Sequence, residues 1–267
     1  MKRCVKCIMP ETKPGIAFDE NGVCNACTHA QLSQSVDWDA RHEELVGLAE
    51  QTKKDKPHGY NCLVAVSGGK DSTFLALTAK EKLGLTPLLV CVEPYSVTDL
   101  GRKNLNNLSD LGFDIFVFKP NHKIMPPLLK RSLYENGNPG SAFEFMLYSV
   151  PMHIAINYGL KLAIWGENSV AEYGNKGKDL GSSANSQKSL CALSGLDSTH
   201  WIAESDNITA QDLLSYQHPS AGELDALGLQ SIYMSHYIKF DSRVIGKLAM
   251  GTEKYKRIAA VFAESPV

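Results

Sequence analysis

The chain has 267 residues, of which 43% are hydrophobic and 21% charged, an ordinary globular composition with enough length for at least one large core. Its formal net charge of −2 gives no basic excess, which disfavours a nucleic-acid partner, because such binders neutralise phosphates with Lys and Arg. No stretch approaches the roughly 18 apolar residues of a membrane span, and Met1-Lys2-Arg3 leads into Cys4 and not into an apolar signal segment, so we expect no membrane contact and a cytoplasmic location.

Four of the seven cysteines form two pairs near the start of the chain. Two residues separate Cys4 from Cys7, and two separate Cys24 from Cys27. This spacing lets both thiolates of a pair bind one tetrahedral metal ion. Two disulfides or a redox pair are the alternatives, although a reducing compartment argues against structural disulfides. We therefore predict a structural zinc ribbon over residues 1–35, whose four thiolates hold Zn²⁺ and leave no open position for chemistry.

Two short signals place the next elements. Asn21-Gly22 is typical of a hairpin turn and comes just before the second cysteine pair. Asp37 and the polar-apolar pattern after it predict a helix with an acidic start, which the lysine run before Pro57 ends. We interpret residues 36–58 as a helical connector.

From residue 59 to 267, apolar runs alternate with helical patterns, which is typical of a parallel sheet covered by helices. The predicted class is therefore α/β, with helices on both faces of the sheet. Cys62 and Cys91 lie in apolar runs and are expected to be small buried hydrophobes. Strands are expected at 62–66, 87–92, 114–118 and 160–165, helices at 71–83, 97–111, 121–135 and 141–158, and a polar loop at 174–186.

The string AVSGGKDST, residues 65 to 73, lies where the first predicted strand ends and the next predicted helix begins. Ser67-Gly68-Gly69 lets successive backbone N–H groups point into one concavity, which is a nest for an anion. The helix that begins near Asp71 adds its positive dipole end, and Lys70 supplies a point charge. The spacing differs from that of the P-loop of kinases and from Gly-x-Gly-x-x-Gly. The alternative is a tight strand-to-helix turn with Asp71 as the N-cap.

This string resembles the pyrophosphate-loop motif of the N-type ATP pyrophosphatases, a superfamily that includes GMP synthetase, asparagine synthetase and the tRNA thiolases. The resemblance implies a Rossmann-like fold of the adenine nucleotide alpha hydrolase type and a reaction that splits ATP into an adenylate and pyrophosphate. It implies that Lys70 and Asp71 are catalytic and that Asp71 holds Mg²⁺. Glu93, at the end of the second strand, is a candidate near the adenosine. The expected ATP-binding residues also include Val66, Ser67, Gly68, Gly69, Lys70, Asp71, Ser72, Thr73 and Gly166.

Trp165-Gly166-Glu167-Asn168 falls at the end of the fourth predicted strand. In open α/β sheets, ligands bind outside the carboxyl ends of the strands, so these side chains are expected to face the same cleft as the glycine-rich loop. Glu167 could coordinate the metal or accept a proton from ammonia, and Asn168 could orient the acceptor or the nucleotide. The alternative is a helix N-cap with an exposed acid.

Several strings taken together resemble the N-acetyl sugar amidotransferases: CVKCIMPETKPGIAFDENGVCNAC, DWDAR, AVSGGKDST, WGENSVAEYG and, less closely, IYMSHYIKFDSR. The resemblance implies an ATP-dependent conversion of a sugar acetamido group into an acetamidino group, in surface-polysaccharide or nonulosonic acid synthesis. The expected substrate is an N-acetyl sugar or a nucleotide-linked N-acetyl sugar.

The nitrogen source is expected to be a separate glutaminase. A glutaminase needs an activated cysteine. In this chain four cysteines are assigned to zinc, two lie in apolar runs, and Cys191 lacks the flanking glycines of a nucleophile elbow.

Two other functions stay open. The first is a tRNA sulfur-transfer enzyme of the same superfamily, because some thiolases also combine a zinc ribbon with a pyrophosphate loop. The second is a shortened nucleotide-binding subunit without catalytic activity.

Overall fold

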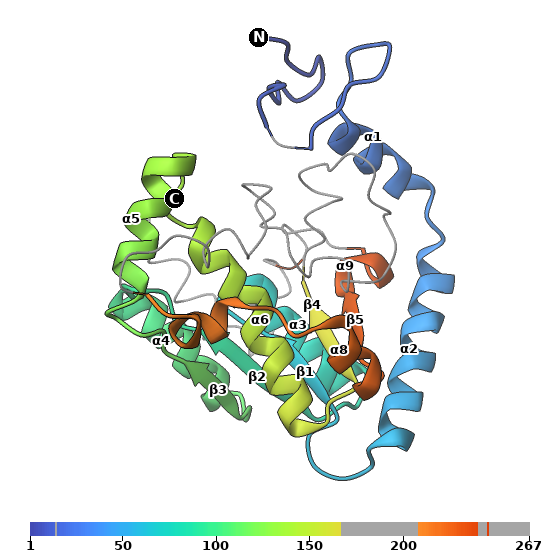
Figure 1. Ribbon diagram of the computed structural model, residues 1–267. Coiled ribbons are helices and arrows are strands. Elements are labelled where there is room, and N and C mark those ends of the chain that lie inside the picture. Colours follow the sequence, from blue (N-terminus) through green and yellow to red (C-terminus); the bar gives the residue numbers. More distant parts are fainter. Residues whose placement is uncertain (14, 167–207, 240–244, 246–267) are drawn as a thin grey trace.

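The computed structural model describes residues 1–13, 15–166, 208–239 and 245. At its centre is a parallel sheet of five strands in the order β3-β2-β1-β4-β5 (Figure 1). The strands are β1 (Cys62–Ala65), β2 (Pro87–Val92), β3 (Ile115–Phe118), β4 (Leu162–Trp165) and β5 (Gln230–Tyr233). The predicted α/β class with a parallel sheet is therefore confirmed.

Helices connect and cover the strands. No helix in the described part of the chain is both long enough and apolar enough to cross a membrane. The α-helices are α1 (Asn25–Leu32), α2 (Trp38–Asp55), α3 (Lys70–Leu77), α4 (Asp99–Asp110), α5 (Met125–Asn136), α6 (Ser141–Tyr158), α8 (Ala221–Leu227) and α9 (Met234–Tyr237). Two short 3₁₀ segments, η1 (Ser33–Ser35) and η5 (Ala210–Tyr216), and a π-helical turn, η2 (Thr78–Lys82), are the other helical segments among the described residues.

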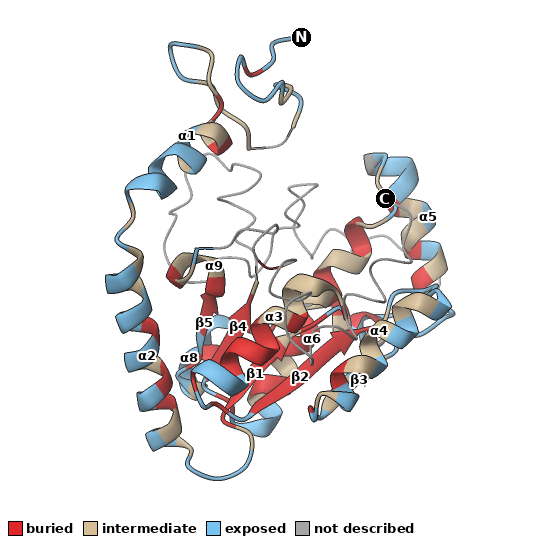
Figure 2. Ribbon diagram, turned by 180° about the vertical axis from the view of Figure 1, so that it is seen from behind, coloured by how far each residue is buried: buried red, intermediate tan, exposed pale blue. Residues whose placement is uncertain are grey.

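The two faces of the sheet carry separate cores, because successive side chains of a strand point to opposite sides. Leu63 of β1 packs in one core with α5, α6, η5 and α8. Val64, the next residue, packs in the other core with α2, α3, α4 and α9. Both side chains are 0% exposed, and burying one such side chain contributes about 1.5–3 kcal/mol. The helices therefore lie on both faces, and the buried residues gather in and beside the sheet (Figure 2).

The long helix α2 connects the N-terminal segment to the sheet. Asp37 caps it by accepting a hydrogen bond from the Ala40 N–H at 3.0 Å, as its position in the sequence predicts. Leu45 packs in the core beside α3. Arg41 Nη1 contacts His236 Nε2 of α9. The helix thus runs along one side of the sheet domain, and the cysteine-containing segment lies beyond its N-terminal end (Figure 1).

The structure differs from the sequence-based expectation at several elements. The helix expected from residue 121 begins at Met125. The helix expected over 71–83 is an α-helix only to Leu77 and then widens into η2. No strand is predicted at β5, which has four residues, pairs with β4 and lies at one edge of the sheet. The four longer apolar runs, in contrast, form strands within two residues of their expected bounds.

Candidate functional site

Residues Ser67–Ser72, which we call the SGGKDS loop, comprise part of the connection from β1 to α3 and the first three residues of α3. The Val66 N–H donates to the Val90 carbonyl at 2.9 Å, so pairing with β2 continues one residue beyond β1 before the loop begins. Gly69 is the N-cap of α3 and no side chain caps the helix, so the alternative with Asp71 as N-cap is wrong. Asp71 lies in the first turn instead. The first N–H groups of α3 are therefore directed out of the helix without an intrahelical acceptor.

Gly68 shows why the loop needs a glycine. Its φ of 82° lies in the left-handed region. A Cβ at this position would also lie 3.0 Å from the backbone nitrogen of Leu105 and 3.3 Å from the carbonyl carbon of Asn104. The loop thus packs directly against the backbone of α4, and a side chain at Gly68 is excluded by both conformation and space. The Gly68 N–H has no acceptor among the described residues.

Two serines hold the loop in shape. Ser72 Oγ accepts a hydrogen bond from the Ser67 N–H at 3.2 Å and lies 3.2 Å from the Gly69 carbonyl, to which it donates. Ser67 Oγ accepts from the Gly69 N–H at 3.3 Å. These local bonds pre-organise the nest that the sequence predicts.

Lys70 and Asp71 form an ion pair with each other. Lys70 Nζ lies 2.8 Å from Asp71 Oδ1 and 2.6 Å from Asp71 Oδ2. Both side chains are part-buried. The charge pair therefore sits at the positive end of α3, at the rim of the pocket described next.

A pocket of about 330 Å³ opens between the SGGKDS loop and helix α6. It lies at the carboxyl ends of β1, β2, β4 and β5, around the point where the chain connections change sides of the sheet, which is where α/β sheets bind ligands. Its floor is polar and its far wall is apolar. The lining residues are Ala65, Val66, Ser67, Gly69, Asp71, Ser72, Leu75, Val90, Val92, Leu147, Tyr148, Pro151, Trp165, Gly166 and Tyr233.

The polar floor fits a magnesium ion bound together with phosphates. The Asp71 carboxylate lines the pocket, and the hydroxyl-bearing residues Ser67 and Ser72 line it as well. Mg²⁺ prefers oxygen ligands and is commonly bound by one or two carboxylates plus substrate phosphates. The donor set of the loop matches that preference.

Of three other residues expected at the site, Gly166 lines the pocket, whereas Thr73 and Glu93 do not. Gly166 lines the pocket, and a Cβ there would lie 3.0 Å from Leu75 Cδ1. Thr73 is buried and its N–H donates to the Gly69 carbonyl at 3.0 Å. Glu93 does not line this pocket; its carboxylate pairs with Arg102 at 3.3 Å and with Lys119 at 3.7 Å. A contact between Glu93 and the nucleotide stays a prediction.

Four expectations fall outside the described residues: Glu167, Asn168, Cys191 and the polar loop at 174–186. The expectation that Glu167 and Asn168 face the cleft stays a prediction. Gly166, the residue directly before them, is described and lines the pocket.

The four N-terminal cysteines come together in space. Their sulfur atoms all lie within 4.8 Å of one another, with Cys4 Sγ 3.9 Å from Cys27 Sγ and Cys7 Sγ 3.5 Å from Cys24 Sγ. A tetrahedral ion with Zn–S bonds of about 2.3 Å places its sulfurs about 3.8 Å apart. The cluster therefore fits a closed Zn²⁺ site.

The backbone around the cluster supports charged sulfur. The N–H groups of Cys24 and Lys6 donate to Cys4 Sγ at 3.2 Å and 3.4 Å. Burial raises the pKa of the Cys4 thiol, but hydrogen bonds from the backbone outweigh it and lower the pKa to about 6. For Cys24, burial raises the pKa above the ordinary value of 9.0. A divalent cation would let all four sulfurs be thiolates together.

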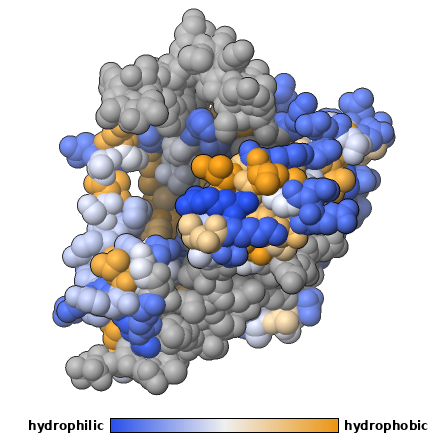
Figure 3. All heavy atoms as spheres, turned by 90° about the horizontal axis from the view of Figure 1, so that it is seen from above, coloured by the Kyte–Doolittle hydropathy of each residue, from blue (hydrophilic) through white to orange (hydrophobic). Residues whose placement is uncertain are grey.

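The predicted turn before the second pair is present. Asn21 and Val23 both donate their N–H groups to Asp19 Oδ1, at 3.0 Å and 2.8 Å, and Gly22 has a φ of 75°. In the first pair, the Ile8 N–H donates to the Cys4 carbonyl at 3.0 Å and leaves Ile8 with a left-handed φ of 59°. Seen from above, hydrophobic and hydrophilic residues lie next to one another on the part of the surface that is coloured (Figure 3).

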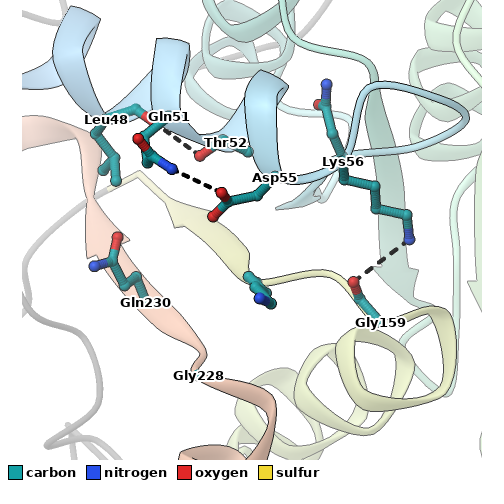
Figure 4. A pocket seen from close by; sticks show the side chains of 10 residues that line it. Leu48, Gln51, Thr52, Asp55, Lys56, Gly159, Gly228 and Gln230 are labelled. Atoms are coloured by element: carbon teal, nitrogen blue, oxygen red, sulfur yellow. Dashed lines mark hydrogen bonds between the residues drawn. The ribbon is translucent and has the colours of Figure 1, made fainter.

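A second cavity, of about 250 Å³, lies at the amino ends of β1, β4 and β5, beside the C-terminal end of α2 (Figure 4). Several of its polar groups are bonded to their neighbours. Lys56 Nζ donates to the carbonyls of Tyr158 and Gly159, at 2.5 Å and 3.4 Å, and Gln51 Nε2 donates to Asp55 Oδ1 at 2.7 Å. Of the two cavities, the one at the SGGKDS loop is therefore the candidate active site.

The apolar wall of this pocket is not predicted by the sequence. Tyr148 and Pro151 come from α6, and Tyr233 comes from β5. The string IYMSHYIKFDSR contains Tyr233, but nothing in the sequence indicates that this residue lies beside Trp165. That proximity follows from the pairing of Trp165 with Tyr233 between β4 and β5.

No family model matches this chain, and no curated protein matches its sequence. Among solved structures, a predicted subunit of tRNA methyltransferase from Methanocaldococcus jannaschii is 17% identical over 77% of this chain and 89% of that chain, with a TM-score of 0.41. NH3-dependent NAD synthetase from Campylobacter jejuni is 17% identical over 86% and 89%, with a TM-score of 0.37. NMN synthetase from Francisella tularensis is 16% identical over 72% and 93%, with a TM-score of 0.36.

Proposed function

We propose that this chain is an ATP-dependent, AMP-forming amidotransferase that converts a sugar N-acetyl group into an acetamidino group. The observation that carries the proposal is the SGGKDS loop: a glycine nest followed by a helix N-terminus, opening into a pocket at the carboxyl ends of the strands. The choice of a sugar acceptor comes from the strings in the sequence that resemble the N-acetyl sugar amidotransferases.

The loop would bind the β- and γ-phosphates of ATP. The N–H groups of Gly68 and of the first turn of α3 would donate to phosphate oxygens, and Lys70 would add a positive charge. The same donors stabilise the charge that grows on pyrophosphate as it leaves. Asp71 would hold Mg²⁺, which neutralises phosphate charge when it is bound.

The acceptor would react in two steps. The amide oxygen attacks the α-phosphorus, the bond from that phosphorus to pyrophosphate breaks, and the amide nitrogen loses its proton. Ammonia then attacks the carbon of this adenylated amide, and AMP leaves with the former amide oxygen. Glu167 is the proposed proton acceptor for ammonia, and Asn168 the proposed orienting residue.

We also propose that a separate glutaminase supplies the ammonia. Of the described cysteines, four form the N-terminal cysteine cluster and the other two are buried. Burial raises the pKa of Cys62 to about 12, and burial with the nearby Glu93 charge raises that of Cys91 to about 11. A thiol with so high a pKa is a poor nucleophile at neutral pH. The isolated protein should therefore use ammonium but not glutamine. Glutamine-dependent turnover by the purified chain alone would contradict this proposal.

The reaction itself is tested by incubating the protein with ATP, Mg²⁺, ammonium chloride and UDP-N-acetylglucosamine or other nucleotide-linked and free N-acetyl sugars. The expected products are AMP, pyrophosphate and a sugar lighter by the difference between oxygen and an NH group, found by mass spectrometry. AMP formation that requires tRNA and a sulfur donor instead would indicate the thiolation reaction. ATP binding without AMP formation under any of these conditions would indicate a non-catalytic subunit.

The Asp71→Asn variant tests the loop directly. It keeps the shape of the side chain and removes the proposed metal ligand, so AMP formation should fall at least a hundredfold while the unfolding temperature changes little. Asp99→Asn is the matched control, because Asp99 is also an acidic residue in the first turn of a helix but does not line the pocket. Normal AMP formation by the Asp71→Asn variant would contradict the proposal that Asp71 binds Mg²⁺.

A further inference from the structure

Three aromatic side chains form the pocket wall that faces the SGGKDS loop. Tyr148 comes from α6, Trp165 ends β4, and Tyr233 ends β5. The rings of Tyr148 and Trp165 pack with their centroids 5.4 Å apart and their planes tilted by 38°. This wall lines the same pocket as Gly166 and Asp71, so an acceptor bound in that pocket beside the loop contacts it.

The indole of Trp165 is fixed in place by its own polar atom. Its Nε1–H donates to Ser231 Oγ of β5 at 2.7 Å, in a buried hydrogen bond. Because that bond satisfies the only polar group of the indole, the ring offers the pocket an apolar surface. Trp165 and Tyr148 therefore favour a small apolar group, such as a methyl, in contact with their rings.

Tyr233 carries a hydroxyl that nothing in the described part of the chain satisfies. The residue is 3% exposed, and its hydroxyl oxygen is buried and has no hydrogen-bond partner among the described residues. Leaving a buried hydroxyl unpaired is costly. Because Tyr233 lines the pocket, a bound ligand is the candidate partner of this hydroxyl. Burial raises the pKa of this phenol, so the hydroxyl stays protonated and can donate.

The wall also lacks a charge to match a charged acceptor. Among the described lining residues no Lys, Arg or His is present, and the acid of the pocket, Asp71, lies on the loop. A carboxylate or an ammonium placed against the wall would lose its solvation without gaining a counter-ion. A neutral amide has no such cost if its carbonyl accepts one hydrogen bond.

We propose that Tyr233 is a specificity-determining residue that donates its hydroxyl proton in a hydrogen bond to the carbonyl of a neutral acylamino group, while Trp165 and Tyr148 hold the methyl of that group. This inference rests on the proposed function and adds to it the residues that read the acceptor. The carbonyl oxygen keeps a second lone pair for attack on the α-phosphorus, so the hydrogen bond positions the oxygen without consuming it.

Tyr233→Phe is the test variant and Tyr216→Phe its matched control. Tyr216 is also a tyrosine that is 3% exposed with a buried, unpartnered hydroxyl, but it lies in η5 and does not line the pocket. Removing an unpaired buried hydroxyl should leave the unfolding temperature of the ligand-free protein equal or higher in both variants. A lower unfolding temperature in the Tyr233 variant alone would show that its hydroxyl has a structural partner and would overturn the inference.

Binding is measured on the full chain with Mg²⁺ and the non-cleavable analogue α,β-methylene-ATP. Calorimetry compares N-acetylglucosamine with glucosamine and glucose, so the result does not depend on turnover. The wild type should prefer N-acetylglucosamine, Tyr233→Phe should weaken that binding about tenfold, as expected for loss of one hydrogen bond, and Tyr216→Phe should leave it unchanged.

The outcomes separate this inference from the proposed reaction. Equal affinity of wild type and Tyr233→Phe for N-acetylglucosamine, or no preference for it over glucosamine and glucose, overturns the role of Tyr233 even if AMP forms. Binding that depends on Tyr233 without AMP formation from any acceptor supports the subsite and contradicts the reaction.

Discussion

The N-terminal cysteine segment and the sheet domain are stabilised in different ways. In the first, the buried cluster consists of Cys4, Cys24 and Ala26 with a few half-buried apolar neighbours. In the second, each face of the sheet carries a core that includes long aliphatic and aromatic side chains from several helices. A segment of about 30 residues cannot bury enough apolar surface to fold by itself, whereas the sheet domain can.

The difference teaches where the stability of each region resides. We expect the cysteine segment to depend on ligand bonds to a metal and the sheet to depend on packing. Each region should therefore respond to a change that leaves the other intact. Four predictions test this separation, beginning with the largest expected effect.

Removal of the metal should unfold the cysteine segment and spare the sheet. Structural zinc sites contribute about 10–16 kcal/mol of binding free energy in small domains, so Cys24→Ser or a strong chelator should make residues 1–32 susceptible to protease. The thermal transition of the sheet, followed by circular dichroism, should remain. Elemental analysis should find zinc in the untreated protein, and an iron chromophore or no metal at all would contradict the assignment. Cys91→Ala is the control, because this buried cysteine of β2 should not change the zinc content.

A cavity made in the core beside the central strand should destabilise the sheet and leave the cysteine segment intact. Leu63 is 0% exposed in β1, so Leu63→Ala should cost about 2–5 kcal/mol of unfolding free energy in urea. The zinc content of the folded protein should not change. Leu133→Ala, at a side chain of α5 that is 49% exposed, should cost less than about 0.5 kcal/mol. Similar losses for the two variants would mean that the sheet core is loosely packed.

The SGGKDS loop allows a finer test within the sheet domain. Gly68 and Gly228 have similar φ values, 82° and 69°, but a Cβ meets the backbone of α4 only at Gly68 and has nothing within 4 Å at Gly228. Gly228→Ala should thus cost about 1–2 kcal/mol, from conformation alone. Gly68→Ala should cost more, because α4 must also move. Equal costs in denaturant unfolding would show that the loop is not pressed against α4.

The smallest expected effect concerns an exposed cap on α8. The Ser220 side chain and backbone N–H hydrogen-bond Glu223 Oε2 at 2.6 Å and 2.8 Å, and these bonds lower the pKa of Glu223 below its ordinary 4.5. Since the folded pKa is lowered, the stabilisation is present above the unfolded pKa and is lost as the pH falls through the folded value. NMR of the side-chain carboxyl groups should show the lowered pKa of Glu223. The Ser220→Ala variant should raise the pKa of Glu223 toward its ordinary value and leave the pKa of Asp212 unchanged. An unchanged Glu223 titration in that variant would rule out the cap as the cause.

The sequence predicts the sheet well because buried parallel strands are continuous apolar runs, as in Pro87–Val92. It does not reveal β5, whose four residues begin with an exposed Gln230 and have no such run. For the loop, composition predicts the anion nest but not which residue caps α3, since that depends on the dihedral angles of Gly69. The aromatic wall is beyond sequence reasoning, because only the pairing of β4 with β5 brings Trp165 and Tyr233 together.

The strand order has a consequence for the growing chain on the ribosome. β1 pairs on one side with β2, the next strand to be made, but on its other side with β4, which is synthesised only after α4, β3, α5 and α6. Until β4 emerges, one backbone edge of β1 has no partner strand, and unpaired edges associate readily with other chains. A nascent chain that stalls after β3 therefore carries the whole SGGKDS loop on a partial sheet that is prone to association through the free edge of β1. Pairing of β4 with β1, and then of β5 with β4, removes that free edge.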